Sequence, residues 1–298
     1  MPDLTEFCPA KINPYLAVTG KRDDGFHDLV SVVSQLSVGD YLEVNATDGG
    51  FSLTCDDSSL PMDGRNLVIR AAEIFRELSG WAGGAEFHLR KILPSGAGLG
   101  GGSSDAVAAL RALNRVSGGM LGAEAMHEAA ARVGSDCPLF LQDQAVIMRG
   151  RGERVEVAPA VTRRMAGREV LLVKPAFGVN TAWAYRRLAA RAPDSYQDSG
   201  PVEEAMRDWG GSERDLSALG FNAFWPIAAE KFPALPAMAT QLWTDFGVHL
   251  QMSGSGSACF LWLDDSTPVD AIVAHVQQAW GRSTWIERAS CLPVSNPD

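Results

Sequence analysis

The sequence predicts an α+β protein with two domains. Its first 55 residues contain β-branched and apolar runs between Gly and Asp breaks, a pattern typical of strands. Helical patterns are then mixed irregularly with strands, which favours two α+β layers over a doubly wound sheet. The 298 residues suit two moderate domains, and a stretch with Pro, paired Arg and Gly at 158–167 divides them. We therefore expect domains at 1–160 and 161–298.

The elements of the expected first domain follow from the spacing of apolar residues. Strands are predicted at "INPYLAVTG", "DLVSVVSQLSV" and "YLEVNAT", and another at "AEFHLRKIL". Residues 66–79 carry one apolar stripe at helical spacing, and 106–116 carry a second. A third helix is expected over 123–133, ending at Gly134. This region therefore combines a sheet with at least three helices.

The second half of the sequence also predicts a mixture of strands and helices. We expect strands at 169–175 and 283–289, helices at 181–190, 222–230, 234–245 and 268–280, and two strands joined by a loop over 249–263. The polar stretch 192–215 is expected to be a long loop or an irregular insertion. A protein-kinase DFG triplet occurs at 245–247 without the accompanying kinase motifs, so we assign it to a helix end capped by Gly247.

Composition excludes several classes of protein. A net charge of -10 and a pI near 5.0 argue against a nucleic-acid binder, which normally has a basic face. The five cysteines are scattered with no CxxC pair, which favours reduced thiols over disulfides or a zinc site. No signal-peptide pattern and no run of 18 apolar residues occurs. We expect a cytoplasmic protein without nucleic-acid or membrane partners.

The stretch "LPSGAGLGGGSSDA" at 93–106 is the strongest chemical signal. A strand, a run of glycines and a helix together can hold phosphate, because backbone N–H groups and the helix N-terminus both face the anion. Ser103 and Ser104 could cap the helix and offer hydroxyls to phosphate. The loop has no lysine, which excludes a Walker A motif. A dinucleotide fingerprint is disfavoured because Glu124, at the required distance, lies in a helical pattern.

Three motifs in order along the chain, "PAKIN", "PSGAGLGGGSSDA" and "SGSGSACF", resemble those of the GHMP kinases, the family of galactokinase, homoserine kinase and mevalonate kinase. The resemblance implies a ribosomal-protein-S5-like first domain and a ferredoxin-like second domain, with ATP and acceptor meeting between them. ATP with Mg²⁺ is the implied cofactor, although no metal ligand is assigned. The implied ATP-binding residues are Pro94, Ser95, Gly96, Ala97, Gly98, Leu99, Gly100, Gly101, Gly102, Ser103 and Ser104 around the phosphates, with Asn66, Leu67 and Lys91 bordering adenine.

The resemblance also implies catalytic and acceptor-binding residues. Asp136 in "GSDCPLF" lies beside the acceptor hydroxyl, as general base or orienting group, and Lys11 balances charge on the transferring phosphoryl group. By themselves, these two residues would be interpreted as a surface lysine and a loop cap. The stretch "PAKIN-YL-VTGKR-DGFHDL" is similar to members that phosphorylate the C2 hydroxyl of cytidine diphosphate-linked methylerythritol. The implied substrate-binding residues are Asn13, Phe26, His27, Tyr185, Gly254, Ser255 and Gly256.

Two departures from that pattern occur, and other functions stay open. Phe26 stands where the family would have Tyr, and Pro14 where an apolar residue is usual. Stacking on a pyrimidine survives the first change, whereas a phenolic hydrogen bond does not. The alternatives are another small-molecule kinase of the homoserine or mevalonate type, or a nucleotide-binding sensor without catalysis. We expect a monomer or weak homodimer acting on a small molecule.

Overall fold

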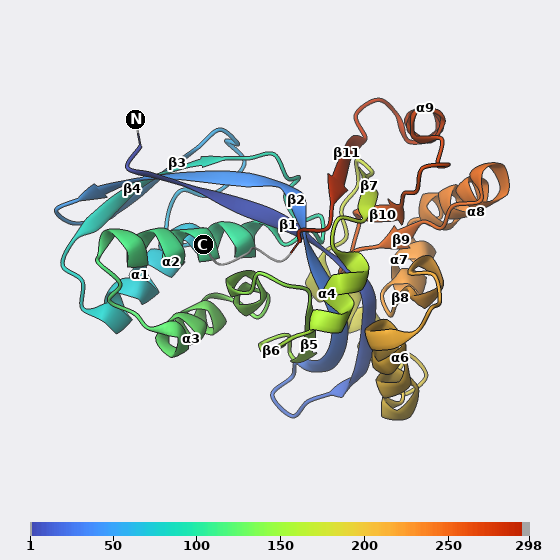
Figure 1. Ribbon diagram of the computed structural model, residues 1–298, viewed down its shortest axis with the longest axis horizontal. Helices are drawn as coiled ribbons and strands as arrows, with labels where there is room; N and C mark the ends of the chain where they lie inside the picture. Colours follow the sequence, from blue (N-terminus) through green and yellow to red (C-terminus); the bar gives the residue numbers. More distant parts are fainter. Residues whose placement is uncertain (1, 294–298) are drawn as a thin grey trace. The chain divides into compact units, whose positions relative to one another are not determined.

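The computed structural model describes residues 2–293 and has the expected mixed α/β character (Figure 1). The chain forms two compact units from interleaved segments. The first unit contains 2–10, 38–95 and 100–142, and the second contains 11–37, 96–99 and 143–293. The last change of unit falls at residue 143, and the boundary expected at residue 160 stays a prediction.

Two long strands run through both units. β1 (Leu4–Lys21) and β2 (His27–Thr47) are neighbours in a sheet of order β3-β4-β2-β1-β8. In the first unit, β2 pairs antiparallel with β4 (Gly84–Arg90), which pairs in parallel with β3 (Phe51–Cys55). The two strands expected at 28–38 and 41–47 are thus one continuous strand, which continues through Gly39 and Asp40.

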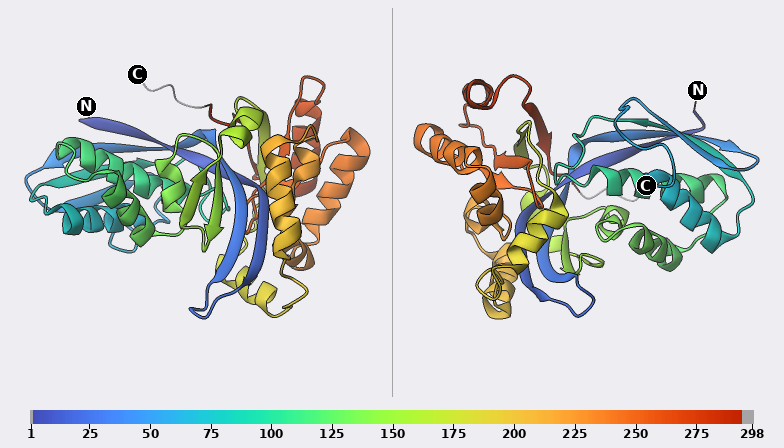
Figure 2. Two further views of the ribbon diagram at one scale, coloured as in Figure 1. Left: turned by 60° about the horizontal axis from the view of Figure 1, so that its bottom comes forward. Right: turned by 180° about the vertical axis from the view of Figure 1, so that it is seen from behind.

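Helices α1 (Leu67–Ser79), α2 (Gly101–Val116) and α3 (Ala123–Val133) complete the first unit, with the short 3-10 helix η1 (Cys137–Leu141). The first two pack side by side along the same face of the strands (Figures 1 and 2). Their apolar stripes form the core with the inward face of the sheet, because Phe75, Leu110 and Phe87 are almost fully buried. Gly134 follows the last residue of α3, as the sequence predicts.

The second unit contains the other ends of β1 and β2. There β2 pairs with β5 (Val146–Gly150), β5 pairs with β6 (Arg154–Val157), and β1 pairs in parallel with β8 (Phe221–Asn222). A separate antiparallel sheet has the order β11 (Trp285–Ser290), β7 (Glu169–Lys174), β10 (Cys259–Trp262) and β9 (Gln251–Met252). Four helices of the second unit are α5 (Thr181–Ala189), α7 (Trp225–Lys231), α8 (Ala234–Phe246) and α9 (Val269–Trp280).

Two expectations about loops are wrong. The stretch 158–167, expected as a break, contains helix α4 (Pro159–Met165), whose Pro occupies the first turn, where proline is well tolerated. The stretch 192–215, expected as a loop, contains helix α6 (Ser199–Gly211), which buries Val202, Met206 and Trp209. Tertiary burial of these apolar residues outweighs the polar composition of the segment.

The interpretation of the DFG triplet is confirmed. Gly247 ends α8 in the left-handed conformation, so the DFG triplet is a helix terminus. Within residues 2–293, every helix is too short or too polar to cross a bilayer.

Candidate functional site

The glycine loop adopts a backbone that side chains would not permit. Gly96, Gly98 and Gly100 have φ angles of 63°, 85° and 76°, in the left-handed region that favours glycine. At Gly98 a Cβ atom would lie 2.3 Å from the carbonyl oxygen of Ser253. The concentration of glycine in this loop therefore has a direct steric cause.

Residues 96–99 are held by two other segments of the second unit. The backbone N–H of Lys11 on β1 donates to the carbonyl of Leu99 at 2.9 Å, and Ala258 N–H donates to the carbonyl of Ala97 at 2.9 Å. The Ser253 hydroxyl donates to the carbonyl of Gly98 at 2.9 Å. Residues of the motifs "PAKIN" and "SGSGSACF" thus hold part of the glycine loop in place by hydrogen bonds.

Lys11 carries a buried ammonium group beside this loop. Its side chain donates to the carbonyl of Gly98 at 2.9 Å and to the amide oxygen of Asn13, and the residue is only 3% exposed. The Asn13 amide nitrogen donates to Ser31 Oγ at 2.9 Å, which donates to the carbonyl of Tyr15 at 2.7 Å. This chain of hydrogen bonds fixes Lys11 and Asn13 together, against the interpretation of Lys11 as a surface lysine.

The second Gly/Ser loop, at 253–257, is equally well fixed. Asn222 donates to the carbonyls of Met252 and Gly254 at 2.7 and 2.9 Å, and the hydroxyls of Ser255 and Thr181 lie 2.9 Å apart. A Cβ atom on Gly254 would lie 3.3 Å from the Lys11 ammonium nitrogen. The loop therefore lies directly against Lys11.

The start of α2 differs from the expectation. Gly100 occupies the N-cap position without a side-chain cap, and Ser103 and Ser104 lie inside the first turn. Neither serine is the expected cap, because two glycines precede them in the helix. The Ser104 hydroxyl is buried and has no hydrogen-bond partner among residues 2–293. An unpaired hydroxyl beside free helix N–H groups is suited to an anionic oxygen.

Asp136 lies in the short turn between α3 and η1. It occupies the N-cap position of η1, is partly buried, and its side chain makes no capping hydrogen bond. The next residue, Cys137, interacts with the side chain of Ser103 in the first turn of α2. Burial raises the pKa of the Cys137 thiol to about 12, so this cysteine is a packing residue. The turn that carries Asp136 therefore packs against the start of α2.

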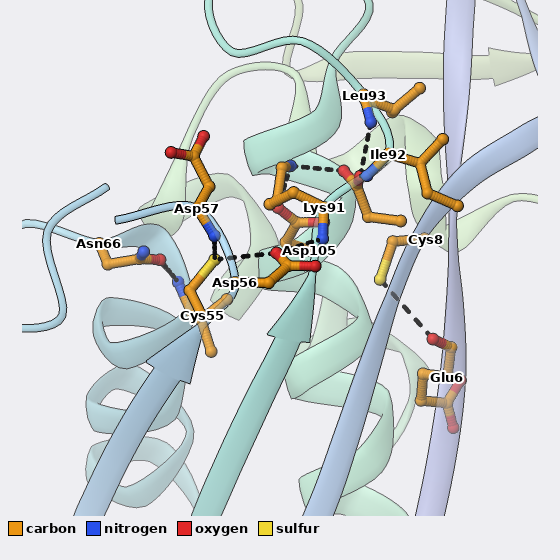
Figure 3. Close-up of polar contacts among 12 residues, drawn as sticks. Glu6, Cys8, Cys55, Asp56, Asp57, Asn66, Lys91, Ile92, Leu93 and Asp105 are labelled. Atoms are coloured by element: carbon orange, nitrogen blue, oxygen red, sulfur yellow. Dashed lines mark hydrogen bonds and ion pairs between the residues drawn. The ribbon is translucent and has the colours of Figure 1, made fainter. Parts of the chain in front are cut away.

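Lys91 belongs to a buried ion cluster of three residues, Asp40, Lys91 and Asp105. Figure 3 labels two of them, Lys91 and Asp105. Its ammonium nitrogen lies 2.5 Å from Asp40 Oδ2 and 3.0 Å from Asp105 Oδ2. The three side chains are 0%, 8% and 3% exposed, in that order. Because the ammonium binds two carboxylates, any contact of Lys91 with adenine is left to its backbone or its aliphatic stem.

Burial and the neighbouring charges together set the pKa values of Asp105 and Lys91. Desolvation raises the pKa of Asp105 to about 7, with the charge of Lys91 opposing and that of Asp40 adding to the rise. Burial acts to lower the pKa of Lys91, but the charges of Asp105 and Asp40 outweigh it and raise that pKa. The lysine is therefore charged, and near neutral pH Asp105 is partly protonated.

His27 lies in an aromatic cluster of the second unit. Its ring centroid lies 5.1 Å from that of Tyr185 and 5.9 Å from that of Tyr196. His27 Nε2 and the Tyr196 hydroxyl are buried and lack hydrogen-bond partners within the described part of the chain. Burial and the charge of Lys21 lower the pKa of His27, so the ring is neutral at pH 7.

The remaining expected residues are placed as follows. Phe26 is 51% exposed, and the Arg151 guanidinium lies 4.8 Å from its ring centroid. Asn66 is the N-cap of α1: its side chain accepts from the Val68 N–H at 3.0 Å. Leu67 begins that helix, and its side chain would lie 3.7 Å from a Cβ on Gly102.

Sequence reasoning missed Asp40, Ser253 and Tyr196. Asp40 interrupts an apolar strand immediately after Gly39, and a charge at such a position is a signal of a buried ion pair. Ser253 begins the third motif and could have been included with it. Tyr196 lies in the loop before α6, and no local sequence pattern indicates its aromatic contact with His27.

Comparison with known proteins gives a consistent result. Residues 66–151 match the family model "GHMP kinases N terminal domain" and 202–282 match "GHMP kinases C terminal". A 4-diphosphocytidyl-2-C-methyl-D-erythritol kinase of Prochlorococcus marinus (strain MIT 9313) is 38% identical over 93% of this chain and 90% of its own. The kinase of the same name from Pelotomaculum thermopropionicum is 36% identical over 86% of this chain and 88% of its own.

Solved structures agree with these sequence matches. A crystal structure of 4-(cytidine 5'-diphospho)-2C-methyl-D-erythritol kinase superimposes with a TM-score of 0.76 at 30% identity, covering 96% of this chain and 99% of that one. The mevalonate kinase of Methanococcus jannaschii has a TM-score of 0.74 at 10% identity, and the match covers 97% of this chain and 98% of that one. The second likeness concerns the fold alone.

Proposed function

This chain belongs to the GHMP kinase family, and from that premise we propose that it transfers the γ-phosphoryl group of ATP to the C2 hydroxyl of 4-diphosphocytidyl-2-C-methyl-D-erythritol. The observation that carries the kinase chemistry is the buried Lys11 ammonium held 2.9 Å from the glycine-loop carbonyl of Gly98. The substrate is proposed from the relatives' names, supported by the His27 cluster.

The glycine loop fits a triphosphate. Its left-handed glycines leave room for phosphate, and the unpaired Ser104 hydroxyl and the N–H groups of the first turn of α2 offer donors. No cluster of three or more His, Cys, Asp or Glu within residues 2–293 could hold a metal ion. In an ATP site Mg²⁺ keeps water and phosphate oxygens as most of its ligands. Bound Mg²⁺ supplies charge neutralisation on the phosphates.

Phosphoryl transfer asks the protein for positioning and charge stabilisation. We assign Lys11 to the negative charge on the transferring group, because its buried ammonium is already oriented by Asn13 and Gly98. Asp136 is assigned to the acceptor hydroxyl, either as general base or as the group that orients it. Asn13 is assigned to the polyol of the acceptor. These roles follow from the family motifs that the residues belong to.

We assign the His27 cluster to the cytosine of the acceptor. A neutral imidazole both donates and accepts hydrogen bonds, which suits the edge of a pyrimidine, and the buried Nε2 atom has no hydrogen-bond partner in the described part of the chain. Tyr185 supplies an aromatic face 5.1 Å from His27. Exposed Phe26 is the other candidate stacking residue, and Gly254, Ser255 and Gly256 are assigned to the acceptor side of Lys11.

The test is ATP consumption by the purified protein with Mg²⁺ and one acceptor at a time: diphosphocytidyl-methylerythritol, homoserine, mevalonate or galactose. We expect turnover with the cytidine compound alone, with the product phosphorylated at C2 as located by ³¹P–¹H NMR. Turnover with another acceptor would keep the kinase chemistry and refute the cytosine assignment. ATP binding without turnover on any acceptor would indicate a sensor.

A further inference from the structure

We propose that Asp40 is a positioning residue for ATP: it fixes the turn at 91–93 and the first residue of α2 to strand β2 at the same time. The proposal rests on the proposed function, since it assigns the 91–93 turn to the adenine side and the start of α2 to the phosphates. All of the residues involved belong to the first unit. Asp40 itself is fully buried and far too enclosed to touch the nucleotide.

The two carboxylate oxygens of Asp40 accept hydrogen bonds from different groups. Oδ1 accepts from the backbone N–H groups of Ile92 and Leu93, at 2.6 and 2.8 Å. Oδ2 accepts from the Lys91 ammonium at 2.5 Å. Asp40 therefore determines the course of the backbone immediately before Pro94, where the glycine loop begins. Hydrogen bonds to a charged, buried carboxylate are among the stronger ones in proteins.

The same carboxylate also lies against the start of α2. A Cβ atom on Gly101 would lie 3.2 Å from Asp40 Oδ2 and 3.3 Å from the Lys91 ammonium nitrogen. Lys91 in turn binds Asp105 on the next turn of that helix at 3.0 Å. The helix N-terminus is thus set against the ion cluster by close packing and by an ion pair. A rigid start of α2 keeps its N–H groups aimed at one point.

Removing the charge of Asp40 should loosen both connections without touching the ligand. In Asp40→Asn, the amide nitrogen faces the Lys91 ammonium, donor against donor, and the ion pair is lost. Misplacement of positioning groups by about 1 Å can cost on the order of 10²-fold in an enzyme. We expect the Kd for ATP, measured calorimetrically without acceptor, to rise at least tenfold. The KM for the acceptor at saturating ATP should stay within twofold.

The matched control is Glu6→Gln, which removes a buried carboxylate that binds the opposite end of α2. Glu6 Oε1 lies 2.7 Å from Arg115 Nη1 near the C-terminal end of the helix. We expect the Kd for ATP to stay within twofold of wild type. An equal loss of ATP affinity in Glu6→Gln, an equal rise in the acceptor KM, or an unchanged Kd for ATP in Asp40→Asn would each overturn the proposal.

A second pair of variants covers the case in which Asp40→Asn does not fold. Lys91→Met removes the link from Asp40 to α2, and Lys91→Arg keeps the positive charge. We expect the first to weaken ATP binding at least tenfold and the second to restore most of it, and equal Kd values in both would refute the role. If ATP affinity falls as expected while wild type never phosphorylates the cytidine compound, the substrate is wrong and the positioning role stands.

Discussion

Asp105→Asn should change how the stability of the protein depends on pH. In the folded protein, burial raises the pKa of Asp105 from 3.8 to about 7, whereas in the unfolded chain the group titrates near its ordinary value. Between these two values the folded state binds more protons than the unfolded state. The contribution of Asp105 to the free energy of unfolding is therefore largest below pH 4 and falls as the pH rises to 7.

The size of the effect follows from the shift. At about 1.4 kcal/mol per pKa unit, a rise from 3.8 to about 7 corresponds to a loss of at most about 4 kcal/mol between pH 4 and pH 8. Asparagine has nearly the shape of a protonated Asp but does not titrate. Asp105→Asn should therefore gain stability relative to wild type as the pH rises, by up to this amount.

Urea denaturation at pH 5, 6, 7 and 8 measures the effect, with the free energy of unfolding obtained at each pH for both proteins. Their difference is the informative quantity, because titrating groups that do not interact with Asp105 contribute equally to both proteins. Lys91 does not interfere, since its raised pKa lies above this range. A difference that is flat from pH 5 to pH 8 would mean that Asp105 is ionised throughout this range, and would refute the assignment of the proton to Asp105.

Three further predictions concern single side chains. Asp136→Asn should lower kcat about 10²–10⁴-fold and leave the Kd for ATP within threefold, because Asp136 is assigned to the acceptor hydroxyl; weakened ATP binding would show a different role. His27→Ala should raise the KM for the cytidine substrate alone, and a matching rise for ATP would contradict its assignment to cytosine. Asn66→Ala removes the cap of α1 and should lower the free energy of unfolding, measured by urea denaturation, by about 1 kcal/mol. An unchanged free energy of unfolding would show that the cap is dispensable.

The sequence predicts most of the fold because its helices have strong apolar stripes and clear ends. Gly134 and Gly247 mark helix ends as expected, and Asn66 caps the N-terminus of the first helix. The failures have one physical cause: α4 and α6 are stabilised by burial against other segments, which local composition does not reveal.

The candidate site was predictable only in part. The three motifs identify Lys11, the glycine loop and the second Gly/Ser loop because each has a characteristic residue pattern. That Ser253 bonds to Gly98, or that Asp40 binds Lys91, depends on contacts between residues 155 and 51 positions apart. Tyr196 is similar, since only the folded chain brings it to His27. No local pattern encodes such pairs.

The interleaving of the two units limits how the chain can be divided. A fragment beginning at residue 143 would contain β5 and β8 but neither β2 nor β1, the strands with which they pair. Unpaired strand edges promote aggregation, so such a fragment should be poorly behaved even though it holds most of the second unit. New chain ends are better placed in a turn inside one unit, such as Gly118–Gly119, where glycines with positive φ join α2 to the segment before α3. A chain break there would leave every described strand with its partner.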